Sequence, residues 1–322
     1  MILPSPHLDE FSLGYAGRIQ RMNYSLSTAM MHNELNQHFP EQLSSQNRKG
    51  KMASIKPLAL AASMDKYEYL RRHTLVPFTH AFSPSEYHVW PHGHTFNLVP
   101  NHPISISPIR RKAQYCQCCS KEQIELMGHC YWKRMHQVPG STHCLIHNEP
   151  LISTDQPDPF LAQPDQCHPN TSRAQINELD RYSTAVRNYE LTSELIIRQR
   201  HPAFLHELFR ALSRKSPRIE QGKLTFQILR DIHDAIYEHF PSKWIAYNAH
   251  DFNLFKIFHS SLSNEAPSLA HVRLDTQSLL LIFCSRFMCT NSIMSKIFQQ
   301  TRFRSESTPR KNNEPLLESL IG

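Results

Sequence analysis

Glycine is scarce in this sequence, at only 8 of 322 residues. Folds that cradle a phosphate group need glycine wherever the backbone must approach the ligand closely. The sequence contains neither a GxGxxG nor a GxxxxGK[ST] motif. We therefore do not expect a dinucleotide-binding domain or a P-loop ATPase.

Long hydrophobic runs are also missing. The longest strongly apolar run, residues 279–284, is far short of the ~20 residues that a membrane span needs. The first six residues show neither the basic segment nor the apolar segment of a secretory signal. We expect a cytoplasmic protein that does not enter a membrane. In that compartment, eight cysteines favour metal ligands and buried thiols over disulfides.

The charge balance is basic. Lys+Arg minus Asp+Glu is 35 − 28 = +7, and the pI is near 9.0. This excess eases the approach of anionic partners, nucleic acid first, without identifying one.

Apolar residues recur at helical spacing towards both ends of the chain, which predicts a mainly α protein. The N-terminal stripe consists of Leu8, Phe11, Tyr15, Ile19 and Met22. The clearest C-terminal stripe consists of Leu224, Ile228, Ile232, Ile236 and Phe240. The predicted organisation is a helical N-terminal region (1–110), a zinc-binding module (111–152), a linker (153–173), a C-terminal helical domain with room for a helix-turn-helix (174–300), and a flexible tail (301–322).

Two pairs of metal-ligand residues, separated by 24 intervening residues, are Cys116 with Cys119 and Cys144 with His147. Two ligands spaced in this way can bind one ion from a tight knuckle turn, and two such turns complete a tetrahedron. A closed Cys₃His shell leaves no open position for a substrate. The spacing therefore predicts one structural zinc ion in a small zinc-ribbon-like module.

The segment between the pairs indicates a short helix. Ser120 and Gln123 form a capping-box pattern at its start, and Gly128 suits its end. The ligand set stays open at this point, because Cys118 and Cys130 lie close by in sequence. Cys167 and His168 could serve a second site but lack a second clear pair.

The surrounding string resembles the TniQ/TnsD family of transposon target-selection proteins. That family has a YCPxC, G-x-x-YW-x-R-x-H-Q-x-P-G, C-x-x-H-x-x-x-L pattern. Here the pattern corresponds to Tyr115–Cys119, to residues 128–140 (GHCYWKRMHQVPG) and to residues 144–151. The opening Pro4 to Glu10 and the segment from His73 to Phe78 resemble the same family, so the likeness covers about residues 1–155. Gln117 stands where the family has proline, which should loosen the first knuckle without removing a ligand.

The resemblance implies a protein that chooses where DNA inserts, recruits the transposon's AAA+ ATPase regulator and is not itself an enzyme. Two routes are known in the family. One type joins a CRISPR Cascade complex as a dimer, and the guide RNA of that complex finds the site. Another type binds a chromosomal attachment site directly. The short chain favours the Cascade route.

Five basic residues near the module are candidate phosphate contacts: Arg110, Arg111, Lys112, Lys133 and Arg134. The alternative is that they form a solvated face of the module.

Two other classes of function are alternatives for a chain with this zinc motif. A zinc hydrolase needs an open metal position and a general base, and the sequence has no HExxH motif. A plain interaction protein, in which zinc only braces helices, differs little from the selector in its chemistry. The family resemblance is what favours DNA targeting.

Overall fold

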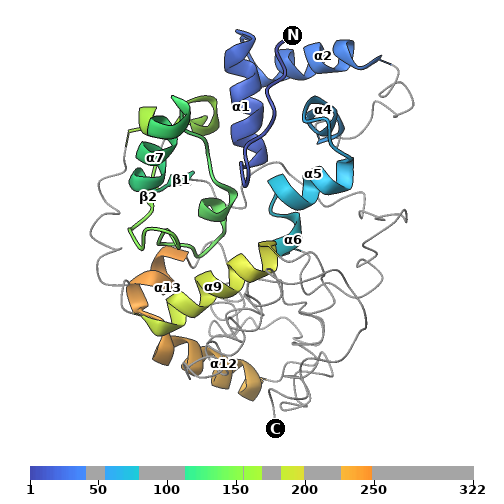
Figure 1. Ribbon diagram of the computed structural model, residues 1–322. Coiled ribbons are helices and arrows are strands. Elements are labelled where there is room, and N and C mark those ends of the chain that lie inside the picture. The colour runs from blue at the N-terminus through green and yellow to red at the C-terminus, as the bar shows by residue number, and fades with distance from the viewer. Residues whose placement is uncertain (41–54, 80–112, 155, 169–182, 199–225, 249–322) are drawn as a thin grey trace, which may run out of the picture.

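The computed structural model describes residues 1–40, 55–79, 113–154, 156–168, 183–198 and 226–248. Within these ranges the chain is mainly α-helical, which confirms the predicted fold class (Figure 1). The only strands in the described ranges are β1 (Gln114–Tyr115) and β2 (Ile152–Ser153). None of the described helices is long and apolar enough to cross a membrane.

In the described part of the N-terminal region, the helices are α1 (Ser12–Met22), α2 (Thr28–His38), α4 (Ile55–Ala61), α5 (Lys66–His73) and α6 (Val76–Thr79). Their shared core contains Tyr15, Ile19, Met31, Leu35 and Leu58, all fully buried. The predicted stripe of α1 is buried at its centre, but Leu8 is 85% exposed.

Local sequence explains where these helices begin. The Ser27 hydroxyl accepts from the Met30 N–H at the start of α2, and the Asp65 carboxylate accepts from the Tyr67 and Glu68 N–H groups at the start of α5. Pro77 lies in the first turn of α6. That position tolerates proline because its N–H would have no helical partner.

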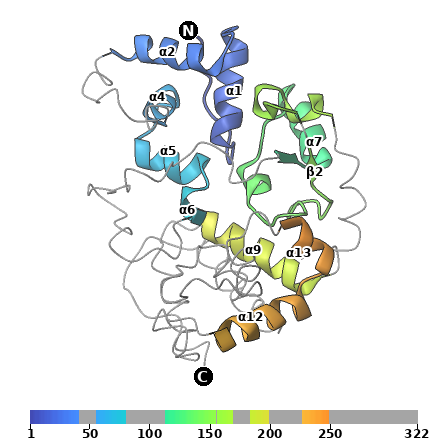
Figure 2. The ribbon, with the colours of Figure 1, turned by 180° about the vertical axis from the view of Figure 1, so that it is seen from behind.

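The module beside α1 contains β1, α7 (Gln117–Met127), the 3₁₀ turn η3 (Arg134–Gln137) and β2 (Figure 2). The two strands pair antiparallel, with Gln114 opposite Ser153 and Tyr115 opposite Ile152. Gly128 ends α7 in the left-handed conformation, as predicted. The expected capping box is wrong, because α7 begins one turn earlier and Ser120 donates to the Cys116 carbonyl.

The segment that we expected to be a linker packs against the N-terminal region in its described part. It forms two 3₁₀ turns, η4 (Pro159–Leu161) and η5 (Pro164–Gln166). Phe160 is 9% exposed and lies against Phe11 and Trp132. The prolines that indicated a linker instead start each turn, so residues 156–168 extend the folded unit.

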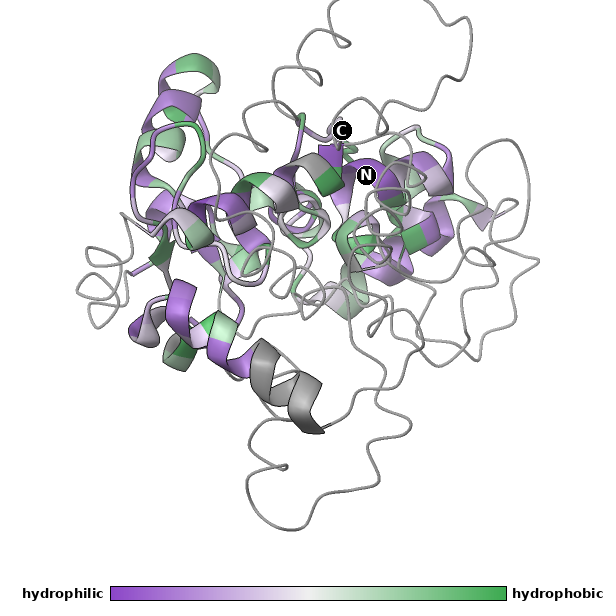
Figure 3. Cartoon of the chain, turned by 90° about the horizontal axis from the view of Figure 1, so that it is seen from below, coloured by the Kyte–Doolittle hydropathy of each residue, from purple (hydrophilic) through white to green (hydrophobic). Residues whose placement is uncertain are grey.

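Among the described residues of the C-terminal region, the helices are α9 (Thr184–Arg198), α12 (Phe226–His239) and α13 (Ser242–Asn248). One end of α9 lies near α6, and α13 lies near the module in both views (Figures 1 and 2). Hydrophilic and hydrophobic residues are mixed along the described helices (Figure 3), as expected where one face packs and the other meets water. The apolar run 279–284 and the tail (301–322) lie outside the described residues, as does much of the predicted helical domain 174–300, and a helix-turn-helix stays a prediction.

Candidate metal centre

The structure brings the four predicted metal ligands together. The ligand atoms of Cys116, Cys119, Cys144 and His147 all lie within 4.8 Å of one another. The three cysteines are buried and the histidine is partly exposed. Residues 31 positions apart in sequence thus meet at one point, at the edge of the module.

The spacing of these atoms fits a tetrahedral zinc ion. Zinc–sulfur bonds of about 2.3 Å and zinc–nitrogen bonds of about 2.0 Å place two sulfurs about 3.8 Å apart, and a sulfur and a nitrogen about 3.6 Å apart. The Cys119 and Cys144 sulfurs are 3.6 Å apart. The His147 Nδ1 atom is 3.6 Å, 3.3 Å and 3.6 Å from the sulfurs of Cys116, Cys119 and Cys144. The donor set and its dimensions therefore suit one metal ion with four protein ligands.

Each knuckle is set by its local backbone. Cys116 is the N-cap of α7, so Cys119 lies in the first turn of that helix. On the second knuckle the Asn148 N–H donates to the Cys144 carbonyl, and Asn148 itself is left-handed with φ 55°. The Cys144 N–H donates to the Glu149 carbonyl. These bonds close a tight turn that points Cys144 and His147 to the same side.

Glu122 orients the histidine ligand. Its carboxylate Oε1 lies 2.8 Å from His147 Nε2, which leaves Nδ1 directed at the three sulfurs. Burial lowers the pKa of His147, but contact with Glu122 and Cys144 outweighs it, and the net pKa is raised. A carboxylate behind a histidine ligand fixes its orientation and increases its basicity, as in many zinc sites. Sequence spacing missed this role, because it gave no reason for Glu122 to face His147.

The three neighbouring thiols resist ionising together, because each thiolate disfavours another negative charge close by. Contacts with Cys119 and Cys144 raise the pKa of Cys116 far above its ordinary value. Lys133 lies beside Cys119, and that contact raises the pKa of the lysine against the opposing effect of burial. His136 contacts the Cys144 sulfur. A divalent cation would stabilise all three thiolates together.

The other candidate ligands lie elsewhere among the described residues. Cys118 packs beside the cluster but is not one of the four converging residues. The Cys130 thiol donates to Asp165 at 2.9 Å. The buried Cys167 thiol lies 3.4 Å from the Gln163 carbonyl oxygen, and His168 is exposed.

Of the five candidate phosphate contacts, the two that lie in the described residues already contact other groups of the protein. Arg134 is 5% exposed, pairs with Asp9 at 3.0 Å, and donates to the carbonyls of Arg71 and Thr74. Lys133 faces the thiols. Arg110, Arg111 and Lys112 lie outside the described residues. Arg134 therefore joins separate segments of the fold in this structure, and the phosphate contacts stay a prediction.

The N-terminal segment contacts one edge of the module through backbone hydrogen bonds. The Phe11 N–H donates to the Trp132 carbonyl, and the Arg134 N–H donates to the Asp9 carbonyl. The fully buried Glu10 carboxylate pairs with Arg18 at 2.7 Å.

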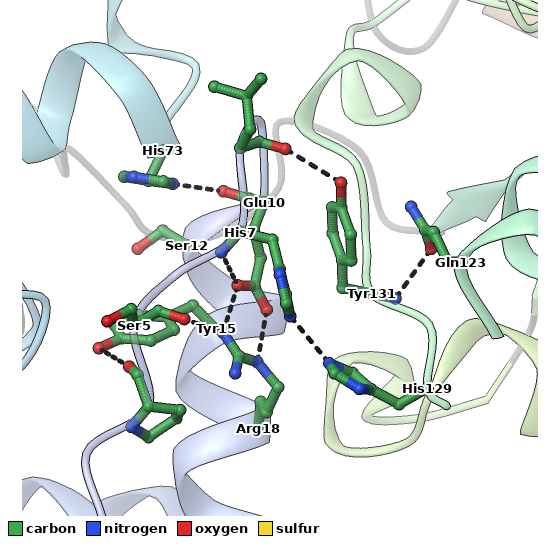
Figure 4. Close-up of polar contacts among 12 residues, drawn as sticks. Ser5, His7, Glu10, Ser12, Tyr15, Arg18, His73, Gln123, His129 and Tyr131 are labelled. Carbon is green, nitrogen blue, oxygen red and sulfur yellow. Dashed lines mark hydrogen bonds and ion pairs between the residues drawn. The ribbon is translucent and has the colours of Figure 1, made fainter. Parts of the chain in front are cut away.

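Two imidazoles, one from the N-terminal segment and one from the module, meet at the same edge (Figure 4). His7 Nε2 lies 2.8 Å from His129 Nε2, and the His7 ring stacks on Tyr131 with ring centroids 4.6 Å apart. The Tyr131 hydroxyl donates to the Leu8 carbonyl. The opening segment and the module are therefore one structural unit.

The comparison with protein families found a match over most of this unit. The TniQ family model matches residues 1–151, from the N-terminal segment to the end of the second knuckle. This region belongs to the TniQ family. No curated protein matches the chain.

The structure gives physical roles to the residues that carried the TniQ resemblance. The carboxylates of Asp9 and Glu10 pair with Arg134 and Arg18. The Gln137 side chain exchanges hydrogen bonds with the backbone of Gln114 in β1. Of these contacts, Asp9–Arg134 joins the module to the N-terminal segment, Glu10–Arg18 lies within the N-terminal region, and Gln137–Gln114 fixes β1 inside the module.

Proposed function

We propose that this chain is a target-site selector of DNA transposition whose TniQ region is braced by one zinc ion. The single observation that carries the proposal is the TniQ match over residues 1–151, a family associated with transposition target-site selection. The four converging ligands lie inside the matched region. The selector marks the insertion site and recruits the AAA+ ATPase regulator, and it does no strand chemistry.

Zinc is the metal that the donor set favours. Three thiolates and one imidazole are borderline-soft ligands, and a compact tetrahedral Cys₃His arrangement is typical of structural zinc. The ion would supply folding free energy to a module with only two short strands and one helix longer than a turn.

A zinc hydrolase is disfavoured by the same geometry. Four protein ligands fill a tetrahedral shell, so no position remains for an activated water. The Glu122 carboxylate contacts His147 and orients it.

We further propose that the chain acts as a dimeric adaptor on a Cascade–guide RNA complex. Burial of Arg134 and the contact of Lys133 with Cys119 engage two of the candidate phosphate-contacting cations within the protein. A weaker phosphate-binding surface supports an adaptor over a protein that reads an attachment site by itself. Direct, guide-independent binding to a chromosomal site is the alternative.

Co-purification separates the two routes. The full chain is mixed with Cascade loaded with guide RNA, and separately with an attachment-site DNA probe at about 0.15 M salt, the physiological range for screened charge. We expect co-purification with loaded Cascade, subsequent retention of the ATPase regulator, and no shift of the DNA probe. Cascade without guide RNA is the control. A sequence-specific shift of the probe by the chain alone would overturn the adaptor route in favour of direct recognition.

A further inference from the structure

The C-terminal helices hold the loop that leads into the metal ligand Cys144. The Tyr189 hydroxyl of α9 donates to the Pro139 carbonyl at 2.7 Å. The Trp244 Nε1–H of α13 donates to the Gly140 carbonyl at 3.2 Å. Tyr189 and Trp244 are both fully buried and their rings meet edge to face. Two helices therefore clamp the same turn of the module.

Glu190 of α9 makes the densest set of contacts with this loop. Its Oε1 atom accepts from the Thr142 N–H at 2.6 Å, the Thr142 hydroxyl at 2.9 Å and the His143 N–H at 2.9 Å. The residue is 2% exposed. Hydrogen bonds to a buried carboxylate are stronger than neutral ones, so this acceptor fixes the loop backbone firmly.

The loop backbone leaves room for α9 at Gly140. Gly140 has φ 86°, a conformation that favours glycine, and a Cβ atom there would lie 2.5 Å from Tyr189 Cε1. Gly140 lies inside the TniQ match, whereas Tyr189, Glu190 and Trp244 lie beyond it. Residues from outside the family region thus complete the metal module.

The held loop is continuous with the second knuckle. The Leu151 N–H donates to the Thr142 carbonyl at 2.8 Å, and His143 pairs with Pro150 in an antiparallel bridge. Residues 142–151 therefore form a closed hairpin-like loop, with Cys144 and His147 at its tip. A shift of Thr142 or His143 moves the Cys144 sulfur relative to the other ligands.

We propose that Glu190 is a positioning residue for Cys144, and that docking of α9 and α13 on residues 139–143 is thermodynamically coupled to metal binding. The proposal rests on the zinc site of the proposed function. Coupling is reciprocal: any partner that displaces these helices weakens metal binding by the factor with which metal strengthens their docking. Metal occupancy would then stiffen the junction between the TniQ region and the C-terminal helices.

The test is zinc affinity, measured on the full chain by competition with a chromophoric chelator. Removing a group that orients a metal ligand weakens affinity by about 10- to 100-fold, and we expect that loss for Glu190→Ala. Glu190→Gln keeps an acceptor oxygen for the same N–H groups and should stay within about threefold of wild type. The matched control is Glu194→Ala, one turn further along α9, where the carboxylate pairs with Arg198. Equal affinity in the wild type, Glu190→Ala and Glu194→Ala would overturn the proposal.

Two further measurements keep the test decisive if Glu190→Ala does not fold. Tyr189→Phe removes only the hydroxyl that donates to Pro139, and loss of one hydrogen bond should weaken zinc binding about fivefold. Chelation of the wild-type chain should speed amide hydrogen exchange in residues 184–198 and 242–248. Unchanged exchange there, with unchanged affinity in Tyr189→Phe, would overturn the coupling while leaving the zinc site intact. A wild-type chain that binds no zinc would overturn both.

Discussion

Arg134 is almost fully enclosed by the protein, and its guanidinium joins three separated segments. It pairs with Asp9 and donates to the carbonyls of Arg71 and Thr74. The sequence pattern could not reveal this, because Asp9 and Arg134 are 125 residues apart. A basic residue in a basic chain resembles a phosphate contact until its acidic partner is known.

Arg134→Ala should lower the free energy of unfolding by about 3–5 kcal/mol, because it leaves a partly buried carboxylate and two carbonyls without their donor. Arg134→Lys should rescue this only partly, since lysine lacks the planar fork. Arg72→Ala is the control: Arg72 pairs with Glu68 at the surface and should cost under about 1 kcal/mol. Urea denaturation measures all three. Full stability in Arg134→Ala, together with weaker nucleic-acid binding, would restore Arg134 as a phosphate contact.

Gly17 allows the segment that contains η4 to pack closely against α1. It lies in α1, where a Cβ atom would come within 1.9 Å of the Phe160 carbonyl oxygen in η4. The close approach is possible only with glycine, and it docks the segment that sequence alone indicated as a linker. The sequence indicated only a linker there, because nothing in a local pattern shows what a segment packs against.

Gly17→Ala should therefore destabilise the protein, by about 1–3 kcal/mol, through overpacking against a backbone that cannot yield cheaply. At an open helical position the same change would stabilise by up to about 1 kcal/mol. Thermal denaturation gives the sign, and hydrogen exchange at residues 159–161 locates the effect. A rise in Tm would mean that η4 does not pack on α1.

The paired imidazoles of His7 and His129 predict a pH dependence at the edge of the module. Burial lowers the pKa of His7 below 6.5, Glu10 opposes this, and Arg18 and His129 add to it. Burial also lowers the pKa of His73. The folded state then binds fewer protons than the unfolded chain as pH falls below about 6.5. Stability should be complete above that pH and decline below it.

His7→Gln should show a smaller loss of unfolding free energy between pH 7.5 and pH 5.5 than the wild type, as measured by urea titration at each pH. Tyr131→Phe is the matched control, because it removes the hydroxyl bond to Leu8 but keeps both imidazoles. It should lower stability about equally at every pH. An identical pH slope in His7→Gln and the wild type would show that this pair does not titrate with unfolding.

At the scale of the whole molecule, the sequence predicted the helical class and the four converging ligands. Both depend on short-range patterns: helical periodicity within one element, and two knuckles of four residues each. Three features depended on long-range packing and were missed: Glu122 behind His147, Asp9 against Arg134, and Glu190 on the loop before Cys144. Each joins residues at least 25 positions apart, where no periodicity connects them.

The central claim is that one zinc ion, held by Cys116, Cys119, Cys144 and His147, braces the TniQ region. X-ray absorption at the zinc edge of the purified chain tests it most directly. We predict one zinc per chain with three sulfur ligands at about 2.3 Å and one nitrogen at about 2.0–2.1 Å. The same spectrum should persist in Cys118→Ser and be lost in Cys119→Ser. A chain without stoichiometric zinc, or a zinc ion with a bound water in place of a sulfur, would contradict the account.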